Sequence, residues 1–157
     1  MPIVFARVDD RLVHGQIVQA WLPMLGAEEV VIPFSKGEKP LFSRGLLRLS
    51  LPYEYDLTVL DTAEAVRHVA TCNKKVFLLT QSLKVMTDLI KDGLQISSVN
   101  IGGMHFKQDA QKLADHVYLS KDDKKALKLI HDLGIQIETR AVPTDVSVAV
   151  TEVLRDA

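Results

Sequence analysis

Cysteine is nearly absent from this chain, because Cys72 is the only one among its 157 residues. A single cysteine cannot form an internal disulfide, and without a second thiol the sequence predicts no thiolate metal cluster. Cys72 stands near the end of a helical pattern. We therefore interpret it as a structural thiol rather than a reactive one.

An excess of one charge is also lacking, since 19 Lys and Arg side chains face 20 Asp and Glu side chains. This balance gives no indication of bulk nucleic-acid binding, and we expect no nucleic-acid partner. Lysines do recur locally, at Lys121, Lys124, Lys125 and Lys128. Acidic Asp122 and Asp123 interrupt them, which favours a solvated helix face.

No apolar run approaches the roughly 20 residues that are needed to span a bilayer, so we expect no direct membrane insertion. The N-terminus has no basic region followed by a small-residue cleavage site, and it does not look like a signal peptide. We expect a cytoplasmic protein. Any membrane role would come through a partner.

The sequence does contain a regular alternation of strand and helix patterns. Its composition, 47% hydrophobic and 25% charged, is that of an ordinary globular protein, and its length fits one domain over residues 1–157. Short apolar runs rich in valine and isoleucine predict strands that are buried on both faces. They occupy residues 3–8, 30–33, 57–60, 76–80, 99–101, 117–119 and 135–139. The fold class predicted is α/β: a three-layer open sheet of about six or seven mainly parallel strands, with helices on both faces.

Several residues mark where helices begin and end. Asp61 and Ser120 are placed as N-caps, and Gly134 is placed to end the helix over residues 121–133. The sequence further predicts a helix over residues 17–25 and a final helix that starts after the Pro143–Asp145 break and runs through Val146, Val150 and Val153. A short basic helix is expected over residues 41–49. Its Arg44 and Arg48 are assigned to solvent by default, with a partner or a phosphate as alternatives.

The loop over residues 9–16 carries the most chemistry. It follows a predicted strand and precedes a predicted helix, and it holds Arg11 and His14 three residues apart. In α/β proteins, ligands usually bind at the carboxyl ends of strands. The following helix would point its free N–H groups and its positive dipole end toward the same place. This arrangement suits an anion, most plausibly a phosphate.

A neutral imidazole is a nucleophile that can attack phosphorus, and a guanidinium offers planar, permanently charged donors to phosphate oxygens. Gly15 would allow close approach of the backbone, and either Asp9 or Asp10 could orient His14 or hold Arg11. The alternative is a loop histidine that makes only structural hydrogen bonds, with at least one aspartate serving as a cap. Gln16 is interpreted as a polar residue of the first helical turn. The remaining histidines are scattered over separate elements, so neither metal-assisted hydrolysis nor any other metal binding is expected; they are His68, His105, His116 and His131.

Two further segments follow predicted strands. Gly102 and Gly103 permit a tight turn or close approach of the backbone, and a structural turn is favoured over a ligand contact. Residues 80–82, Thr-Gln-Ser, are interpreted as a helix cap, with a place in the same cleft as the alternative.

Residues 6–16, ARVDDRLVHGQ, resemble the signature of the IIB component of the mannose/fructose/sorbose family of the bacterial phosphoenolpyruvate-dependent sugar phosphotransferase system. Residues 98–104 and 141–145 resemble two further blocks of that family, so the resemblance covers nearly the whole chain. It implies a protein-phosphohistidine–sugar phosphotransferase that needs no cofactor. The donor partner would be a IIA phosphocarrier, and the acceptor would be a sugar carried by the membrane permease components IIC and IID.

The resemblance also implies roles for single residues. His14 would carry the phosphoryl group on Nδ1, and Arg11 would stabilise it. Asp10, Gly15 and Gln16 match flanking motif positions, as phosphate-binding or loop-supporting residues. One stretch, residues 34–55, departs from the family pattern. The family commonly has an Asn-Asp pair after the second strand and an acidic helix beyond it, whereas residues 33–40 here read PFSKGEKP and the basic segment from Arg44 to Arg48 follows. The alternative function is therefore a regulatory module whose binding depends on phosphorylation. A hydrolase with His14 as general base has little support, because no nucleophile or metal set accompanies it.

Overall fold

A computed structural model describes residues 2–40 and 42–155 of the chain. Six parallel strands form one open sheet in the order β3-β2-β4-β1-β5-β8. Their bounds are β1 Ile3–Asp9, β2 Glu29–Phe34, β3 Asp56–Asp61, β4 Val76–Thr80, β5 Ser98–Gly103 and β8 Gln136–Glu138. All six were predicted, and the bounds of β4 agree exactly with the expected ones.

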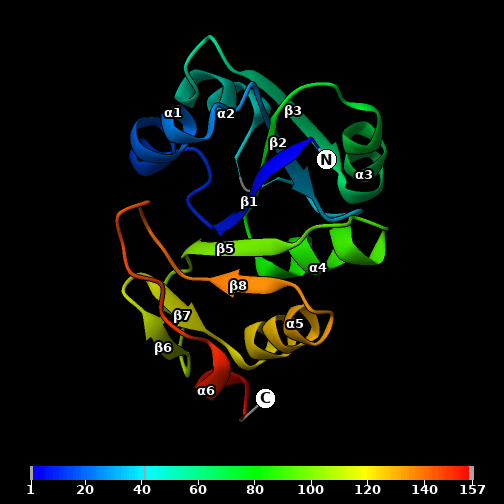
Figure 1. Ribbon diagram of the computed structural model, residues 1–157. Coiled ribbons are helices and arrows are strands. Elements are labelled where there is room, and N and C mark those ends of the chain that lie inside the picture. Colours follow the sequence, from blue (N-terminus) through cyan, green and yellow to red (C-terminus); the bar gives the residue numbers. More distant parts are fainter. Residues whose placement is uncertain (1, 41, 156–157) are drawn as a thin grey trace.

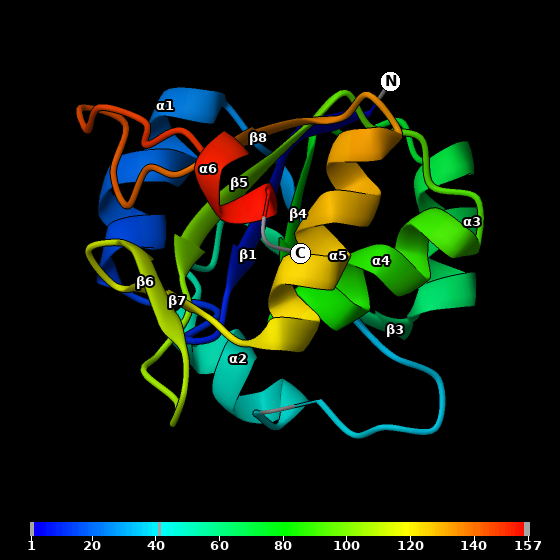
Figure 2. The same cartoon turned by 90° about the horizontal axis from the view of Figure 1, so that it is seen from below.

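Helices cover both faces of this sheet, as predicted, so the domain has three layers (Figures 1 and 2). One face packs against the segment η1 (Ile17–Trp21), a π-helical turn that continues into α1 (Leu22–Leu25), and against α2 (Arg44–Ser50). The other face packs against α3 (Thr62–Thr71), α4 (Leu83–Lys91) and α5 (Lys121–Asp132), with α6 (Thr151–Leu154) beside α5. Figure 2 shows α1 on one side of the sheet and α3, α4 and α5 on the other.

The predicted helix ends are confirmed at several residues. The side chain of Asp61 accepts a hydrogen bond from the backbone of Glu64, and Ser120 forms a capping box with Asp123. Ser82 caps α4 in the same way, through the N–H of Val85. Gly134 follows α5 with a φ of 80°, a left-handed conformation that glycine adopts without steric cost.

One strand prediction needs correction, and one strand was missed. Residues Val117–Leu119 form a strand, β7, but it does not join the main sheet. It pairs antiparallel with β6 (Gln111–Ala114) in a separate two-stranded sheet. Strand β6 was not predicted, because its Gln-Lys-Leu-Ala sequence is too short and too polar to give a strand pattern.

Two helix predictions also need correction. The final helix was expected to begin after Asp145, yet α6 starts only at Thr151. The carboxylate of Asp145 instead accepts hydrogen bonds from the backbone N–H groups of Ala141 and Val142, so it closes a turn. The basic helix α2 begins at Arg44, after the N-cap Ser43, and not near residue 41. Leu41 lies outside the described residues.

None of the helices within the described residues has the length and apolar character needed to cross a bilayer.

Candidate active site

The loop that carries Arg11 and His14 leaves the carboxyl end of β1, a strand that lies between β4 and β5. The turn is held by Leu12, whose N–H donates to the backbone oxygen of Asp9 at 3.0 Å. Leu12 has a φ of 52°, which is unusual for a residue with a side chain, and that side chain is fully buried. Packing of Leu12 in the core therefore holds a backbone conformation that costs roughly 1 kcal/mol or more.

Asp9 is the centre of the site. Its side chain is fully buried, and its two oxygens face six N–H groups of Arg7, Arg11 and His14. Oδ1 accepts from the backbone N–H and the Nε of Arg11, at 3.1 and 3.0 Å. Oδ2 lies 2.9 Å from Nη2 of Arg7 and 2.9 Å from Nε2 of His14. Asp9 thus both orients the imidazole and holds Arg11, which the sequence left open between Asp9 and Asp10.

The contact with Asp9 sets the tautomer of His14. An ionised carboxylate only accepts hydrogen bonds, so Nε2 of His14 must carry the proton that is shared at 2.9 Å. In a neutral imidazole the lone pair then resides on Nδ1. Nδ1 has no hydrogen-bond partner within residues 2–40 and 42–155, and the side chain is 18% exposed. The site presents an oriented nitrogen nucleophile.

Arg7 supports this arrangement from inside β1. Its guanidinium is fully buried and donates to Asp9, to Oδ1 of Asn100 at 2.8 Å and to the backbone oxygen of Ala141 at 3.1 Å. A buried charge of this kind is tolerated only when it is paired and fully hydrogen-bonded. Arg7 therefore ties the loop to β5 and to the segment after β8.

Gly102 and Gly103 do not form the predicted turn. Both belong to β5, next to β1, and neither has a positive φ. A Cβ atom on Gly102 would lie 1.9 Å from Cζ of Arg7, and one on Gly103 would lie 2.9 Å from Oδ1 of Asp9. The glycines are needed because the buried Arg7–Asp9 pair occupies the space of a side chain.

Arg11 and Gln16 lie against each other at the open side of the site. Nη2 of Arg11 donates to Oε1 of Gln16 at 3.1 Å and to Oδ2 of Asp9 at 3.1 Å, while 39% of the Arg11 side chain stays exposed. Two guanidinium groups, of Arg7 and Arg11, thus share one carboxylate. The surplus positive charge suits an anion.

The other two motif residues take different positions. Asp10 does not touch the imidazole of His14; its Oδ2 accepts from the backbone N–H of His105 at 2.7 Å and lies 2.5 Å from Nδ1 of that residue. Asp10 therefore ties the loop to the segment after β5. Gly15 is exposed, and a Cβ atom there would meet nothing within 4 Å. The expected close approach of the Gly15 backbone to a bound phosphate stays a prediction.

The pKa of Asp9 follows from these contacts. Burial raises it, but hydrogen bonds from His14 and Arg11 and the charge of Arg7 outweigh burial and hold it well below its ordinary value. A lowered pKa in the folded state means that the ionised carboxylate stabilises the fold at pH values above the ordinary value of about 3.9. That stabilisation is lost as the pH falls below this value and through the lower pKa of the folded state.

This dependence predicts how acid acts on the protein. The difference in free energy of unfolding between the native chain and an Asp9→Ala variant should be constant from pH 7 to about 5, and should shrink steadily below about pH 4. Urea denaturation at a series of pH values measures it. A difference that stays constant down to pH 2 would contradict the assigned pKa direction.

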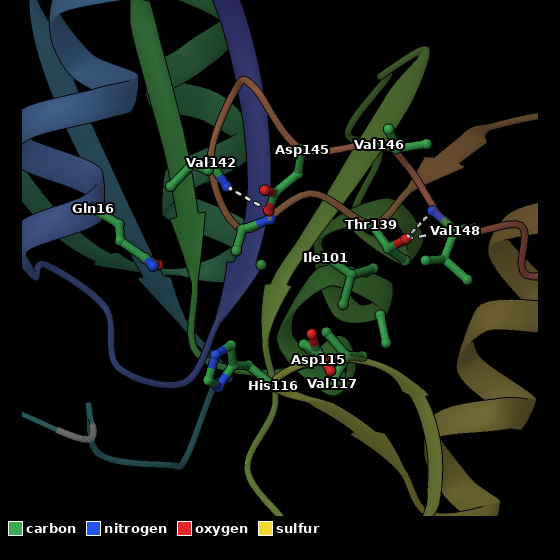
Figure 3. A pocket seen from close by; sticks show the side chains of 13 residues that line it. Gln16, Ile101, Asp115, His116, Val117, Thr139, Val142, Asp145, Val146 and Val148 are labelled. Atoms are coloured by element: carbon green, nitrogen blue, oxygen red, sulfur yellow. Dashed lines mark hydrogen bonds between the residues drawn. The ribbon is translucent and has the colours of Figure 1, made fainter.

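A pocket of about 430 Å³ adjoins the loop (Figure 3). Gln16 lies on one side of it, Val146 and Val148 lie on the other, and His116 lies below. The Thr139 hydroxyl donates to the backbone oxygen of Val148 at 3.0 Å and accepts from its N–H at 2.7 Å. These bonds fix the shape of the segment that closes the pocket.

The stretch that departs from the family pattern begins at the carboxyl end of β2, on the same edge of the sheet as His14. Strand β4 separates β2 from β1, so this end lies about two strand spacings, roughly 10 Å, from β1. Arg48 donates to the backbone oxygens of Leu51, Pro52 and Tyr55, so its guanidinium stabilises a loop. This differs from the default assignment to solvent. Arg44 is exposed, as expected.

Sequence reasoning did not single out Arg7 and Leu12. Arg7 had a visible signal, because a charged residue inside an otherwise apolar strand must find a partner in the interior. Leu12 had none, since a left-handed leucine is not visible in a residue pattern. Arg11, His14 and Gln16, chosen from the sequence, do come together.

Comparisons with known proteins give a consistent result. Residues 3–157 match the family model described as "PTS system sorbose subfamily IIB component". The sorbose-specific EIIB component of Lacticaseibacillus casei is 35% identical over 94% of this chain and 92% of its own length. The mannose-specific EIIAB component of Escherichia coli K12 is 30% identical over 92% of this chain, which spans 46% of that relative. The crystal structure of the IIBSor domain of the sorbose permease from Klebsiella pneumoniae has a TM-score of 0.86 and 28% identity, over 100% of this chain and 98% of that one.

Proposed function

Given that the chain belongs to the sorbose subfamily of phosphotransferase-system IIB components, which act in sugar phosphotransfer, we propose that His14 is the residue that carries the phosphoryl group. It accepts the group on Nδ1 from a phosphohistidine of a IIA protein and donates it to a sugar. The observation that carries this proposal is the 2.9 Å contact between Nε2 of His14 and Asp9, which leaves the lone pair on Nδ1.

The transfer balances without a change of protonation at His14. The Nδ1 lone pair forms the new P–N bond while the P–N bond of the donor breaks, and its electron pair returns to the donor nitrogen. The proton on Nε2 stays between His14 and Asp9, where the carboxylate stabilises the more cationic phosphorylated ring. In the second step a sugar hydroxyl attacks phosphorus, its proton passes to solvent, and the P–N electron pair returns to Nδ1.

Arg11 supports this transfer electrostatically. Phosphoryl transfer depends mainly on positioning and on stabilising charge that is spread over the phosphoryl oxygens. Asp9 and Gln16 hold the Arg11 guanidinium through Nε and Nη2 before the group arrives, so the N–H groups of Nη1 can donate to the phosphoryl oxygens. We propose that Asp10 supports the loop through its contacts with His105. Gly15, which has no side chain, would leave open the space that the phosphoryl group enters.

The proposed partners follow from the same family. The similarity to a mannose-specific EIIAB component supports a IIA protein or domain as the donor. The acceptor would be a sugar bound by membrane permease components IIC and IID, which would bring this chain to the inner face of the membrane. The cytoplasmic location stays a prediction from the sequence.

A phosphotransfer assay tests the proposal. Incubation with phosphoenolpyruvate and the upstream carriers should place one acid-labile, base-stable phosphate on the chain, and His14→Ala should abolish it. A matched control is His131→Gln, an exposed histidine of α5, which should label normally. Labelling that survives His14→Ala would overturn the proposal.

The regulatory alternative is separated by a second experiment. Leu46, Leu49 and Tyr53, in or just after α2, are 50%, 86% and 97% exposed, and they lie in the stretch that departs from the family pattern. A pull-down should compare phosphorylated and unphosphorylated chain. Retrieval of permease components alone supports the carrier, whereas a different partner that binds one phosphorylation state supports the regulatory module.

A further inference from the structure

A second cluster of reactive side chains lies at the opposite edge of the sheet from His14. Glu29 is the first residue of β2, His68 belongs to the last turn of α3, and Cys72 caps that helix. His68 and Cys72 are four residues apart, a spacing that places both on one face of a helix end. Each of the three residues offers one ligand atom, and these atoms all lie within 4.8 Å of one another.

Glu29 organises the cluster. Its side chain is only 4% exposed, and its carboxylate accepts a hydrogen bond from the hydroxyl of Thr58. Oε2 lies 2.9 Å from Nε2 of His68, and Oε1 lies 3.2 Å from Sγ of Cys72. Within residues 2–40 and 42–155, the only ion-pair partner of Glu29 is His68. Lys74 acts on Glu29 through its charge, but its ammonium pairs with Asp56, so Glu29 has no direct contact with a permanent cation of the kind that Arg7 and Arg11 give to Asp9 among the described residues.

The surroundings of Glu29 and Cys72 shift the pKa values of both groups. Burial raises the pKa of Glu29, but hydrogen bonds from Thr58, Cys72 and His68 outweigh it, and the pKa lies below its ordinary value. Burial and the neighbouring Glu29 carboxylate raise the pKa of Cys72. Near neutral pH the thiol is therefore protonated, and it donates to the carboxylate.

We propose that Glu29, His68 and Cys72 form a zinc site. A carboxylate oxygen, an imidazole nitrogen and a thiolate are the three kinds of ligand that Zn²⁺ takes in proteins. Tetrahedral coordination would need these atoms roughly 3.3–3.6 Å apart, and they now lie within 4.8 Å of one another, so side-chain rotations would have to bring them to a metal. His68 is 34% exposed, so water can complete the coordination.

Binding exchanges protons for the metal. The thiol of Cys72 loses its proton to solvent and becomes a thiolate ligand. The proton that Nε2 of His68 shares with the Glu29 carboxylate moves through solvent to Nδ1, so that Nε2 coordinates through its freed lone pair. Glu29 already carries its charge. Two negative ligands then balance the two charges of Zn²⁺. The metal would join the start of β2 to the end of α3, far along the strands from the phosphoryl site.

Three measurements on the full chain test the site. Zn²⁺ alone, titrated against a chromophoric chelator, should bind at one equivalent. Co²⁺ should give the near-ultraviolet charge-transfer absorption that requires a thiolate ligand. Zn²⁺ should also slow alkylation of Cys72, and because this is the only cysteine, the mass shift reports it without ambiguity.

The variants replace His68 and Cys72, which are partly exposed, rather than the buried Glu29, so that loss of metal binding is not caused by unfolding. Cys72→Ser and His68→Gln should each weaken Zn²⁺ binding by at least about tenfold, because each removes a bond to the metal. Cys72→Ser should also abolish the Co²⁺ band. The control His131→Gln removes an exposed histidine outside the cluster and should leave binding unchanged.

The proposal is overturned if Zn²⁺ binding is unchanged in Cys72→Ser, if Co²⁺ gives no thiolate band, or if His131→Gln weakens binding as much as His68→Gln. The first and last results would show adventitious binding to surface groups. Absence of binding would show that the cluster is a hydrogen-bonded structural triad. None of these results depends on phosphotransfer.

Discussion

Replacing Asp9 by asparagine should slow phosphoryl uptake by His14 by about 10²- to 10⁴-fold. Both oxygens of Asp9 accept from donors, Oδ1 from Arg11 and Oδ2 from Arg7 and His14. An asparagine NH₂ group would therefore face a donor in either orientation. Where it faces Nε2 of His14, that nitrogen must become the acceptor, and the proton moves to Nδ1, where it blocks attack on phosphorus.

The measurement is the single-turnover rate of uptake from a phosphorylated IIA donor. Asp10→Asn is the matched control, since Asp10 contacts His105 and not His14, and we expect it to lower the rate by less than about tenfold. Circular dichroism and thermal unfolding must show that both variants fold, because Asp9→Asn also weakens a buried ion pair. A folded Asp9→Asn protein that accepts phosphate at the native rate would refute the role of Asp9.

The largest expected effect on stability comes from Gly102→Ala. The new Cβ would lie 1.9 Å from Cζ of Arg7 and 2.0 Å from its Nη2, so the guanidinium must move. Asp9 would then lose a buried partner, and breaking such a pair costs about 3–5 kcal/mol. For a domain of this size the midpoint of thermal unfolding should fall by roughly 6–20 °C. Phosphoryl uptake should fall as well, because the same displacement disturbs the support of His14.

Gly45→Ala is the control for this substitution. Gly45 lies in α2 with no positive φ, and a Cβ atom there would meet nothing within 4 Å. Alanine at that position should stabilise the helix by about 0.5–1 kcal/mol. Calorimetry measures the unfolding midpoints of Gly102→Ala and Gly45→Ala. Equal unfolding midpoints would show that the space at Gly102 is not reserved for Arg7.

Much of the fold could be predicted because its signals are local. Most strands of the main sheet contain a short apolar run, and caps such as Asp61 and Ser120 satisfy backbone groups only three residues away. The errors arise where distant contacts override the local pattern. Pro143 and Asp145 look like a helix start, but the Asp145 carboxylate bonds to the preceding turn, and Val146 is 89% exposed.

In the candidate site, too, the features set by local sequence could be predicted, and those set by distant contacts could not. The positions of Arg11 and His14 follow from a loop between a strand and a helix, which a sequence shows. The support of that loop is not local, because Arg7 bonds to Asn100, 93 residues away, and to Ala141, 134 residues away. The two glycines of β5 therefore looked like a turn, whereas Gly102 leaves room for Arg7 and Gly103 leaves room for Asp9 and Arg11.

The most direct test of the account is nuclear magnetic resonance of the phosphorylated chain with ¹⁵N-labelled histidine. Coupling between phosphorus and a ring nitrogen identifies the atom that carries the group. Because Asp9 holds Nε2 of His14 at 2.9 Å, the account predicts phosphorus on Nδ1 of His14 with the proton retained on Nε2. Phosphorus on Nε2, or on any residue other than His14, would contradict it.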